Sequence, residues 1–145
     1  ELKICRIFNT YGPNMDPNDG RVISNFINQA LNNNPITIYG EGNQTRSFCY
    51  VVDLVDGIFK LMNIGYTIDT PLNLGNPEEI SILDLAKKVL LLTNSDSKIN
   101  YKKLPDDDPR KRKPDIELAK KLLLWSPKIN LDDGLKQTIS FFNLK

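Results

Sequence analysis

Two glycines, a glutamine and an arginine lie close together in the segment 40–46, which reads GEGNQTR. Gly40 and Gly42 allow positive φ angles and a close backbone approach, so backbone amides there can point at an anion. Arg46 can add a bidentate, charge-assisted hydrogen bond to a phosphate. The same residues also suit a plain glycine turn that carries a solvated arginine. This segment alone therefore leaves both a phosphate cradle and a surface turn open.

A second arginine, Arg21, follows Asp19 and Gly20 where a helix is expected to begin. A helix N-terminus carries unpaired amides and a partial positive charge, so an arginine there enlarges an existing anion site. A positive charge in the first turn is also unfavourable against the positive end of the helix dipole. The presence of Arg21 there therefore favours a functional role. The alternative is a surface arginine that pairs with Asp19.

The third basic segment is DDDPRKRKPD at 106–115, where three acids precede four bases. A self-neutralising surface loop is one interpretation. Nucleic-acid binding is not expected, because the acids cancel the field of the bases and no aromatic ladder accompanies them. Arg112 and Asp115 are more informative. An arginine can bind the diphosphate of a nucleotide, and a carboxylate can accept hydrogen bonds from the paired hydroxyls of its ribose.

Composition excludes several other kinds of site. The 145 residues carry a net charge of +1 and contain no histidine, which removes Ser-His and Cys-His catalysis and the usual zinc sites, and no metal site is expected. None of the five tyrosines is followed four residues later by lysine, and no G-x-G-x-x-G precedes a helix. No segment has the length of a membrane span, and Cys5 and Cys49 lie in apolar contexts typical of buried thiols.

Hydrophobic periodicity predicts strands that alternate with helices, and hence an α/β fold. Asp53, Asp115 and Asp132 are expected to cap helices, and Ser81 with Asp84 has the spacing of a capping box. The helix after Asp53 should turn Leu54, Ile58, Leu61 and Met62 inward. The expected strands or extended segments are 2–8, 35–39, 46–52, 71–76 and 98–104, and a helix is expected over 22–31.

The three arginines fall on loops near the ends of predicted strands. Because α/β folds place ligands at such loops, we expect Arg21, Arg46 and Arg112 to converge on one diphosphate.

Several segments resemble the C-terminal part of UDP-glucuronic acid decarboxylases, also called UDP-xylose synthases, which are extended short-chain dehydrogenases/reductases. N-x-Y-G-P and G-x-G-x-Q-x-R are shared with sugar-nucleotide dehydratases and epimerases, whereas D-D-P-x-x-R-x-P-D and G-N-P-E-E are more particular to the decarboxylases. The segments are RIFNTYGP (6–13), NDGRVISNFI (18–27), YGEGNQTRSFCYVVDLVDGI (39–58), LNLGNPEE (72–79) and DDPRKRKPDI (107–116).

The resemblance implies that residues 1–13 are the last strand of a truncated NAD-binding Rossmann domain, and that 14–145 form a small α/β domain binding the UDP-sugar. In such enzymes NAD oxidises C4 of the glucuronate, the β-keto acid loses carbon dioxide, and the returned hydride gives UDP-xylose. The chain lacks the Tyr-x-x-x-Lys pair and the NAD fingerprint, so it should be inactive without the missing Rossmann part. A homodimer is expected at full length.

Carried over by motif, Asn9 would bind the substrate near its diphosphate, and Arg21 and Arg46 would neutralise phosphate oxygens. Tyr39 would line the uracil pocket, with Gln44 supporting the same loop.

Arg112 would face the diphosphate and sugar as an electrostatic clamp at the reaction centre, because a guanidinium stays protonated and is a poor acid. Asp115 would accept from ribose hydroxyls or only cap its helix, and Thr10 would approach the nicotinamide. Asn14 stands where many relatives have an arginine, so the chain departs from the family's pattern at this position.

Two alternatives remain at this point. One is a sibling nucleotide-sugar 4,6-dehydratase or 4-epimerase with the same grip on UDP, and the other is a UDP-binding module without catalysis. The compartment, cytoplasm or Golgi lumen, is left open. Because residues 2–8 should belong to a parallel sheet, we expect this strand to need a partner, either the missing half or another copy of the chain.

Overall fold

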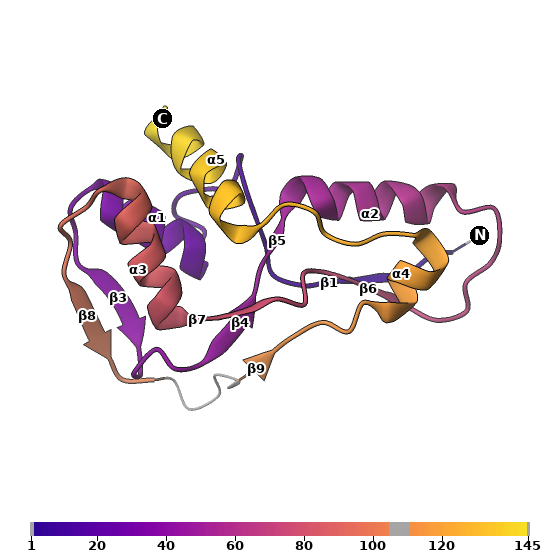
Figure 1. Cartoon of the computed structure of the whole chain (residues 1–145), viewed down its shortest axis with the longest axis horizontal. Coiled ribbons are helices and arrows are strands. Elements are labelled where there is room, and N and C mark those ends of the chain that lie inside the picture. The colour runs from indigo at the N-terminus through magenta and orange to yellow at the C-terminus, as the bar shows by residue number, and fades with distance from the viewer. Residues whose placement is uncertain (1, 105–110, 145) are drawn as a thin grey trace.

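The computed structural model describes residues 2–104 and 111–144 and confirms the predicted α/β class (Figure 1). The molecule is elongated, with α1, α3, β3 and β8 at one end and β1, β6, α2 and α4 at the other. The helices are α1 (Val22–Leu31), α2 (Val51–Asn63), α3 (Ile82–Thr93), α4 (Glu117–Leu123) and α5 (Leu131–Asn143). The strands are β1 (Cys5–Ile7), β2 (Thr10–Tyr11), β3 (Ile36–Tyr39), β4 (Thr45–Ser47), β5 (Cys49–Tyr50), β6 (Leu72–Leu74), β7 (Glu79–Ser81), β8 (Ile99–Lys102) and β9 (Lys111–Arg112).

Most strand pairs within the described residues are parallel. β1 pairs with β6, β2 with β5, and β3 with β8, all in parallel register. The remaining sheet has the order β7-β4-β9, in which β4 runs antiparallel to β7 and parallel to β9. The central strand β4 therefore brings together two segments that follow it far along the chain.

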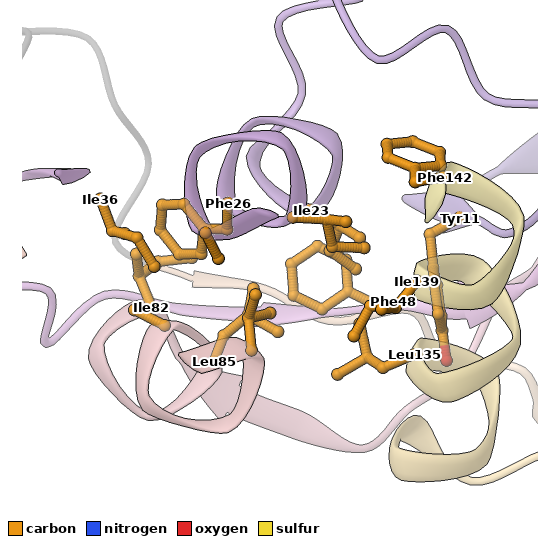
Figure 2. Close-up of a cluster of buried hydrophobic side chains, with 14 of the residues drawn as sticks. Tyr11, Ile23, Phe26, Ile36, Phe48, Ile82, Leu85, Leu135, Ile139 and Phe142 are labelled. Carbon is orange, nitrogen blue, oxygen red and sulfur yellow. The ribbon is translucent and has the colours of Figure 1, made fainter. Parts of the chain in front are cut away.

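One hydrophobic core lies between three helices. Side chains from α1, α3 and α5 point into the same space as Phe48, which follows β4 (Figure 2). Ile23, Ile27 and Leu85 are among its fully buried members. The spacing of apolar residues over 22–31 predicted this face of α1, and the structure confirms it.

A second core holds the other end of the molecule together. Leu72 and Leu74 of β6 pack with residues of α2 and α4 and with Trp125, whose indole donates a 2.9 Å hydrogen bond to the carbonyl of Asp53. Cys49 belongs to this core, and burial, together with the carboxylate of Asp53, raises the pKa of its thiol to about 12. Cys49 thus acts as a small apolar residue, as its sequence context predicted.

The helix starts agree only in part with the predicted caps. Ser81 caps α3 as expected, accepting from the amide of Asp84 at 3.0 Å. The prediction for Asp53 is wrong, because α2 begins two residues earlier and the Asp53 carboxylate instead accepts from the amide of Ile129 at 2.9 Å. The prediction for the last helix is also wrong, since Asn130 is its N-cap and Asp132 lies within the first turn.

Two further expectations need correction. The segment 46–52 is not one strand, because β4 and β5 belong to different sheets and Val51 already starts α2. Met62 does not face inward; its side chain is exposed, whereas Leu54 and Leu61 are buried as predicted. The strand expected at 2–8 is shorter, covering Cys5–Ile7. The division of the chain at residue 13 stays a prediction.

Candidate functional site: an arginine groove

Two of the three predicted arginines are neighbours in one sheet. In the parallel pair β4–β9, Arg46 lies directly opposite Arg112. Side chains at paired positions of adjacent strands share a face of the sheet, so both guanidinium groups emerge on the same side. Arg46 also donates from Nη1 to the carbonyl of Thr45 at 2.9 Å.

The glycine turn that precedes β4 is anchored at both sides. Gly40 and Gly42 have φ angles of 67° and 79°, which favour glycine. The Gln44 amide donates from Nε2 to the carbonyl of Tyr39 at 2.9 Å, which closes the turn. The amide of Ile82 donates to the carbonyl of Gln44 at 3.1 Å, which fixes the turn to the start of α3. The turn thereby holds Tyr39 and Arg46 in a defined relation.

Arg21 is the N-cap residue of α1, and its side chain pairs with Asp19. Its Nε donates to Oδ2 of Asp19 at 2.6 Å, and Nη1 donates to the carbonyl of Thr10 at 3.4 Å. The ion pair that the sequence left open is therefore present, and it holds the guanidinium beside β2. Burial raises the pKa of Asp19, but hydrogen bonds from Ser24 and Arg21 outweigh it, so this carboxyl has a pKa below its usual value.

Asn9 and Thr10 border the same region from the other side. Asn9 donates from Nδ2 to the carbonyl of Ser47 at 3.3 Å, and its own carbonyl accepts from the amide of Cys49 at 2.8 Å. The Thr10 hydroxyl donates to the carbonyl of Phe8 at 2.8 Å. The end of β1 is thereby tied to the strand that carries Arg46.

Two hollows that share Arg46 and Val22 join Asn9, Arg21, Tyr39 and Gln44 to Arg46 in one groove. Arg112 lines neither hollow and is placed near the groove only by its register opposite Arg46. The volumes of the two hollows are about 100 and about 210 Å³, small beside the roughly 300–1,000 Å³ of a typical ligand pocket. They are therefore small hollows and not a pocket that could enclose a whole nucleotide sugar. The first is lined by Asn9, Thr10, Tyr11, Met15, Arg21, Val22, Ile23, Arg46 and Phe48, and the second by Gly20, Val22, Asn25, Phe26, Thr37, Tyr39, Gln44, Arg46 and Ile82.

Asp115 does not join the arginines. Its Oδ1 accepts from the amide of Glu117 at 2.9 Å at the start of α4, and its carbonyl accepts from Nδ2 of Asn73 at 2.9 Å. It lies along a separate hollow with Pro77, Lys113 and Lys120. The expected cap at Asp115 is wrong by one residue, because Ile116 is the N-cap of α4, although the Asp115 carboxylate still bonds an amide of the first turn. The acidic half of the charged segment 106–115 lies outside the described residues.

A larger hollow of about 540 Å³ lies between β7 and the helices α3 and α5. Its lining includes four carboxylates, from Glu78, Glu79, Asp132 and Asp133, and only two lysines. Lys88 pairs with Asp132 at 2.5 Å, so that cation is already neutralised. Four carboxylates against two lysines give this hollow a surplus of negative charge, which disfavours a diphosphate. Among the described residues that line the groove at Arg46 there is no carboxylate, although Arg21 is paired with Asp19 beside it.

Sequence reasoning missed two polar residues in the groove. Asn25 lies one helical turn after Arg21 and donates from Nδ2 to the carbonyl of Gly20 at 3.0 Å. Thr37 lies on β3 two residues before Tyr39 and donates its amide to Oε1 of Gln29 at 3.0 Å. Four residues separate Asn25 from Arg21, and two separate Thr37 from Tyr39, so each side chain shares a face with a residue already predicted to bind the substrate. This periodicity is the sequence signal that could have identified them.

Within residues 2–104 and 111–144, no group of three or more cysteine or carboxylate side chains is arranged to hold a metal ion. None of the helices in these ranges is long and apolar enough to cross a membrane.

Comparison with protein-family models gives a match over residues 1–75 to the NAD dependent epimerase/dehydratase family. The chain belongs to this family. The match covers both β1 and the Gly40–Arg46 turn, so it includes most of the residues that form the groove.

Curated relatives are more specific. The chain is 50% identical over 142 residues to UDP-glucuronic acid decarboxylase 1 of Xenopus tropicalis, and 51% identical over 142 residues to UDP-glucuronic acid decarboxylase 4 of Arabidopsis thaliana. Each alignment covers 98% of this chain but only 33% and 32% of the relative. The chain therefore spans about a third of the length of these proteins, and the family resemblance seen in the sequence is confirmed.

Solved structures of the same fold include a UDP-glucose 4-epimerase from Thermotoga maritima with UDP-glucose, at a TM-score of 0.92 and 31% identity. A UDP-glucuronic acid 4-epimerase from Bacillus cereus, in complex with UDP-glucuronic acid and NAD, gives a TM-score of 0.91 and 31% identity. This chain is covered to 98% in both, and spans 46% and 45% of theirs.

Proposed function

We propose that this chain is the UDP-sugar-binding part of an NAD-dependent UDP-glucuronate decarboxylase, which makes UDP-xylose and carbon dioxide. The observation that carries the proposal is the register of Arg46 against Arg112 on one face of a sheet, with Arg21 lining the adjoining hollow. Identity of about 50% to decarboxylases over nearly the whole chain supports this chemistry above that of other family members.

In this proposal the diphosphate lies over Arg46 and between Arg21 and Arg112, each of which supplies charge-assisted hydrogen bonds. Asn9 binds the substrate near the diphosphate. Tyr39 and its backbone line the uracil pocket in the second hollow, held by Gln44.

Arg112 acts on charge that develops on the sugar as well as on the phosphates, as an electrostatic clamp. Asp115 is proposed to keep only its bond at the start of α4, because that bond occupies one of its carboxylate oxygens away from the groove.

The residues of this chain do not by themselves fit NAD. The dinucleotide fingerprint and the Tyr-x-x-x-Lys pair are absent from the sequence, and the groove suits a diphosphate on an open floor. NAD would supply the hydride acceptor and donor. It would be held mainly by the part of the relatives that this chain does not match, and Thr10 would lie at the edge of the NAD site. We therefore propose two partners for the chain. The first is the unmatched part of the relatives, into whose sheet residues 1–13 would extend. The second is another copy of the full-length protein.

A 4-epimerase is the second candidate, favoured by the solved epimerases that share the fold at 31% identity. Both enzymes would grip UDP in the same way. They differ in outcome, because only the decarboxylase releases carbon dioxide and a pentose sugar nucleotide.

The test is a chimera in which this chain replaces the matching third of the Xenopus tropicalis relative. We expect the chimera to convert UDP-glucuronate to UDP-xylose with release of carbon dioxide, and the chain alone to show no turnover. Formation of UDP-galacturonate without carbon dioxide would assign the epimerase instead. A folded chimera that binds UDP and turns over neither product would indicate a binding module.

A further inference from the structure

Arg112 is carried by a strand too short to hold it firmly by backbone pairing alone. β9 covers only Lys111–Arg112, and it pairs with β4 at Thr45 and Arg46. A ladder of this length supplies few backbone hydrogen bonds, and most strands in folded proteins are longer. The position of Arg112 relative to Arg46 therefore depends on further contacts around β9.

Glu79 supplies such a contact. It begins β7 and lies opposite Ser47 of β4, in the sheet β7-β4-β9 between the two ends of the molecule (Figure 1). Its Oε1 accepts from the Thr45 hydroxyl at 2.8 Å. Its Oε2 lies 3.5 Å from Nζ of Lys113, the residue directly after Arg112. One carboxylate of β7 thus contacts both β4 and the segment that carries Arg112.

The contacts of Glu79 lie on the face of the sheet opposite to the two arginines. Successive side chains of a strand point to opposite faces, so Thr45 and Lys113 face away from their neighbours Arg46 and Arg112. Holding Lys113 on one face directs Arg112 to the other, where Arg46 lies. Glu79 lines neither hollow of the groove, so it leaves the proposed place of the diphosphate free.

This ion pair is partly shielded from solvent. The side chain of Glu79 is 20% exposed and that of Lys113 is 48% exposed. Ser47, opposite Glu79, is buried, and so is Pro114, whose Cγ would lie 3.0 Å from a β-carbon at Gly75. Salt screens a partly buried pair less than a fully exposed one. The contact is therefore suited to holding the chain at β9 in place.

We propose that Glu79 is a positioning residue for the diphosphate site, holding β9 against β4 so that Arg112 stays opposite Arg46. The inference rests on the proposed function, in which these two guanidinium groups bind one diphosphate. Glu79 itself touches no substrate. As a negative charge near the site it would weaken anion binding, whereas as a tether for β9 it strengthens anion binding. The sign of its effect on UDP affinity therefore distinguishes the two roles.

The test is calorimetric titration of UDP into the chimera described above. Glu79→Gln should bind UDP about fivefold more weakly than the wild-type chimera, because the amide keeps the shape of the side chain but loses the ion pair with Lys113. Glu78→Gln is the matched control, since it removes the same charge at the adjacent, exposed residue, and its UDP affinity should not fall.

A double-mutant cycle shows whether Glu79 acts through Arg112. The double variant Glu79→Gln/Arg112→Ala should bind UDP as Arg112→Ala alone does, because without the guanidinium there is nothing left to position. Exchanging the charges, Glu79→Lys with Lys113→Glu, should restore the affinity to within about twofold of the wild type, whereas either change alone should lower it. The Thr45 hydroxyl can accept as well as donate, so it tolerates this exchange.

Unchanged or tighter UDP binding by Glu79→Gln overturns the inference, as does an additive loss in the double variant. If Glu79→Gln does not fold, the charge-exchange variant decides, and failure to restore affinity overturns the inference. A folded wild-type chimera that binds no UDP refutes the proposed function instead. Amide hydrogen exchange over residues 111–113 then tests the tether by itself: it should be faster in Glu79→Gln than in Glu78→Gln, and equal exchange overturns the inference.

Discussion

At the scale of single residues, the three-dimensional structure decides which group each charged side chain of the candidate site contacts. Arg21 is held by Asp19 and Thr10, and Arg46 is placed by the turn that precedes it. Asp115 shows the opposite outcome, since the sequence allowed a ribose contact or a helix-terminus bond and the structure contains the latter. Residue types alone did not distinguish these outcomes, because the same carboxylate serves both.

The lowered pKa of Asp19 gives a pH-dependent stability. A carboxyl whose pKa is lower in the folded than in the unfolded state contributes stability above the unfolded value, about 3.9, and loses it as pH falls through the folded value. Asp19→Asn should therefore be less stable than the wild type by about 0.5–1 kcal/mol at pH 6, a value reduced for solvent screening.

Urea denaturation at pH 6 and pH 3.5 measures this difference, which should shrink at the lower pH. Asp96→Asn, which removes the same charge at an exposed residue, serves as the control. A gap between Asp19→Asn and the wild type that is equal at both pH values would contradict the role given to this charge.

At the scale of elements, local patterns were predictable and long-range pairing was not. Ser81 and Asp84 form their cap because both partners lie within one turn. The start of α2 was misjudged because Asp53 bonds to Ile129, far along the chain. Met62 was placed inward because periodicity marks apolar positions without telling which surface covers them. The register of Arg46 against Arg112 likewise arises from the pairing of β4 with β9, for which no local motif exists.

The packing of α2 predicts that replacing Gly57 by alanine destabilises the fold, although alanine has the higher helix propensity. Replacing a helical glycine by alanine usually stabilises by about 1 kcal/mol. At Gly57, however, a β-carbon would lie 2.9 Å from Cε2 of Trp125 and 3.2 Å from Leu74. We expect Gly57→Ala to destabilise the fold by about 1–3 kcal/mol through overpacking.

Thermal and chemical denaturation of Gly57→Ala tests this, with Gly65→Ala as the control. Nothing lies within 4 Å of a β-carbon at Gly65, so the control should stay near the wild-type stability. A more stable Gly57→Ala variant would show that α2 is not seated on Trp125 as described.

At the scale of the whole molecule, the chain spans about a third of the length of its decarboxylase relatives. The arginine groove consists of two small hollows, and α2 exposes Val52, Val55, Phe59 and Met62 along one side. In the proposed function, the part of the relatives that this chain does not match would add further walls to the groove. Periodicity predicted the buried residues Leu54 and Leu61 of α2, whereas the exposure of Met62 required the structure.

The central claim is that guanidinium groups from separate segments hold one diphosphate. Calorimetric titration with UDP and with uridine, which lacks the phosphates, tests it most directly in wild type, Arg46→Ala and Arg112→Ala. Each variant should lose about 2–3 kcal/mol of UDP affinity and leave uridine binding unchanged. Arg6→Ala is the matched control, because Arg6 lies on β1, which pairs with β6 and not with β4 or β9. Unchanged UDP affinity in Arg46→Ala or Arg112→Ala would contradict the account.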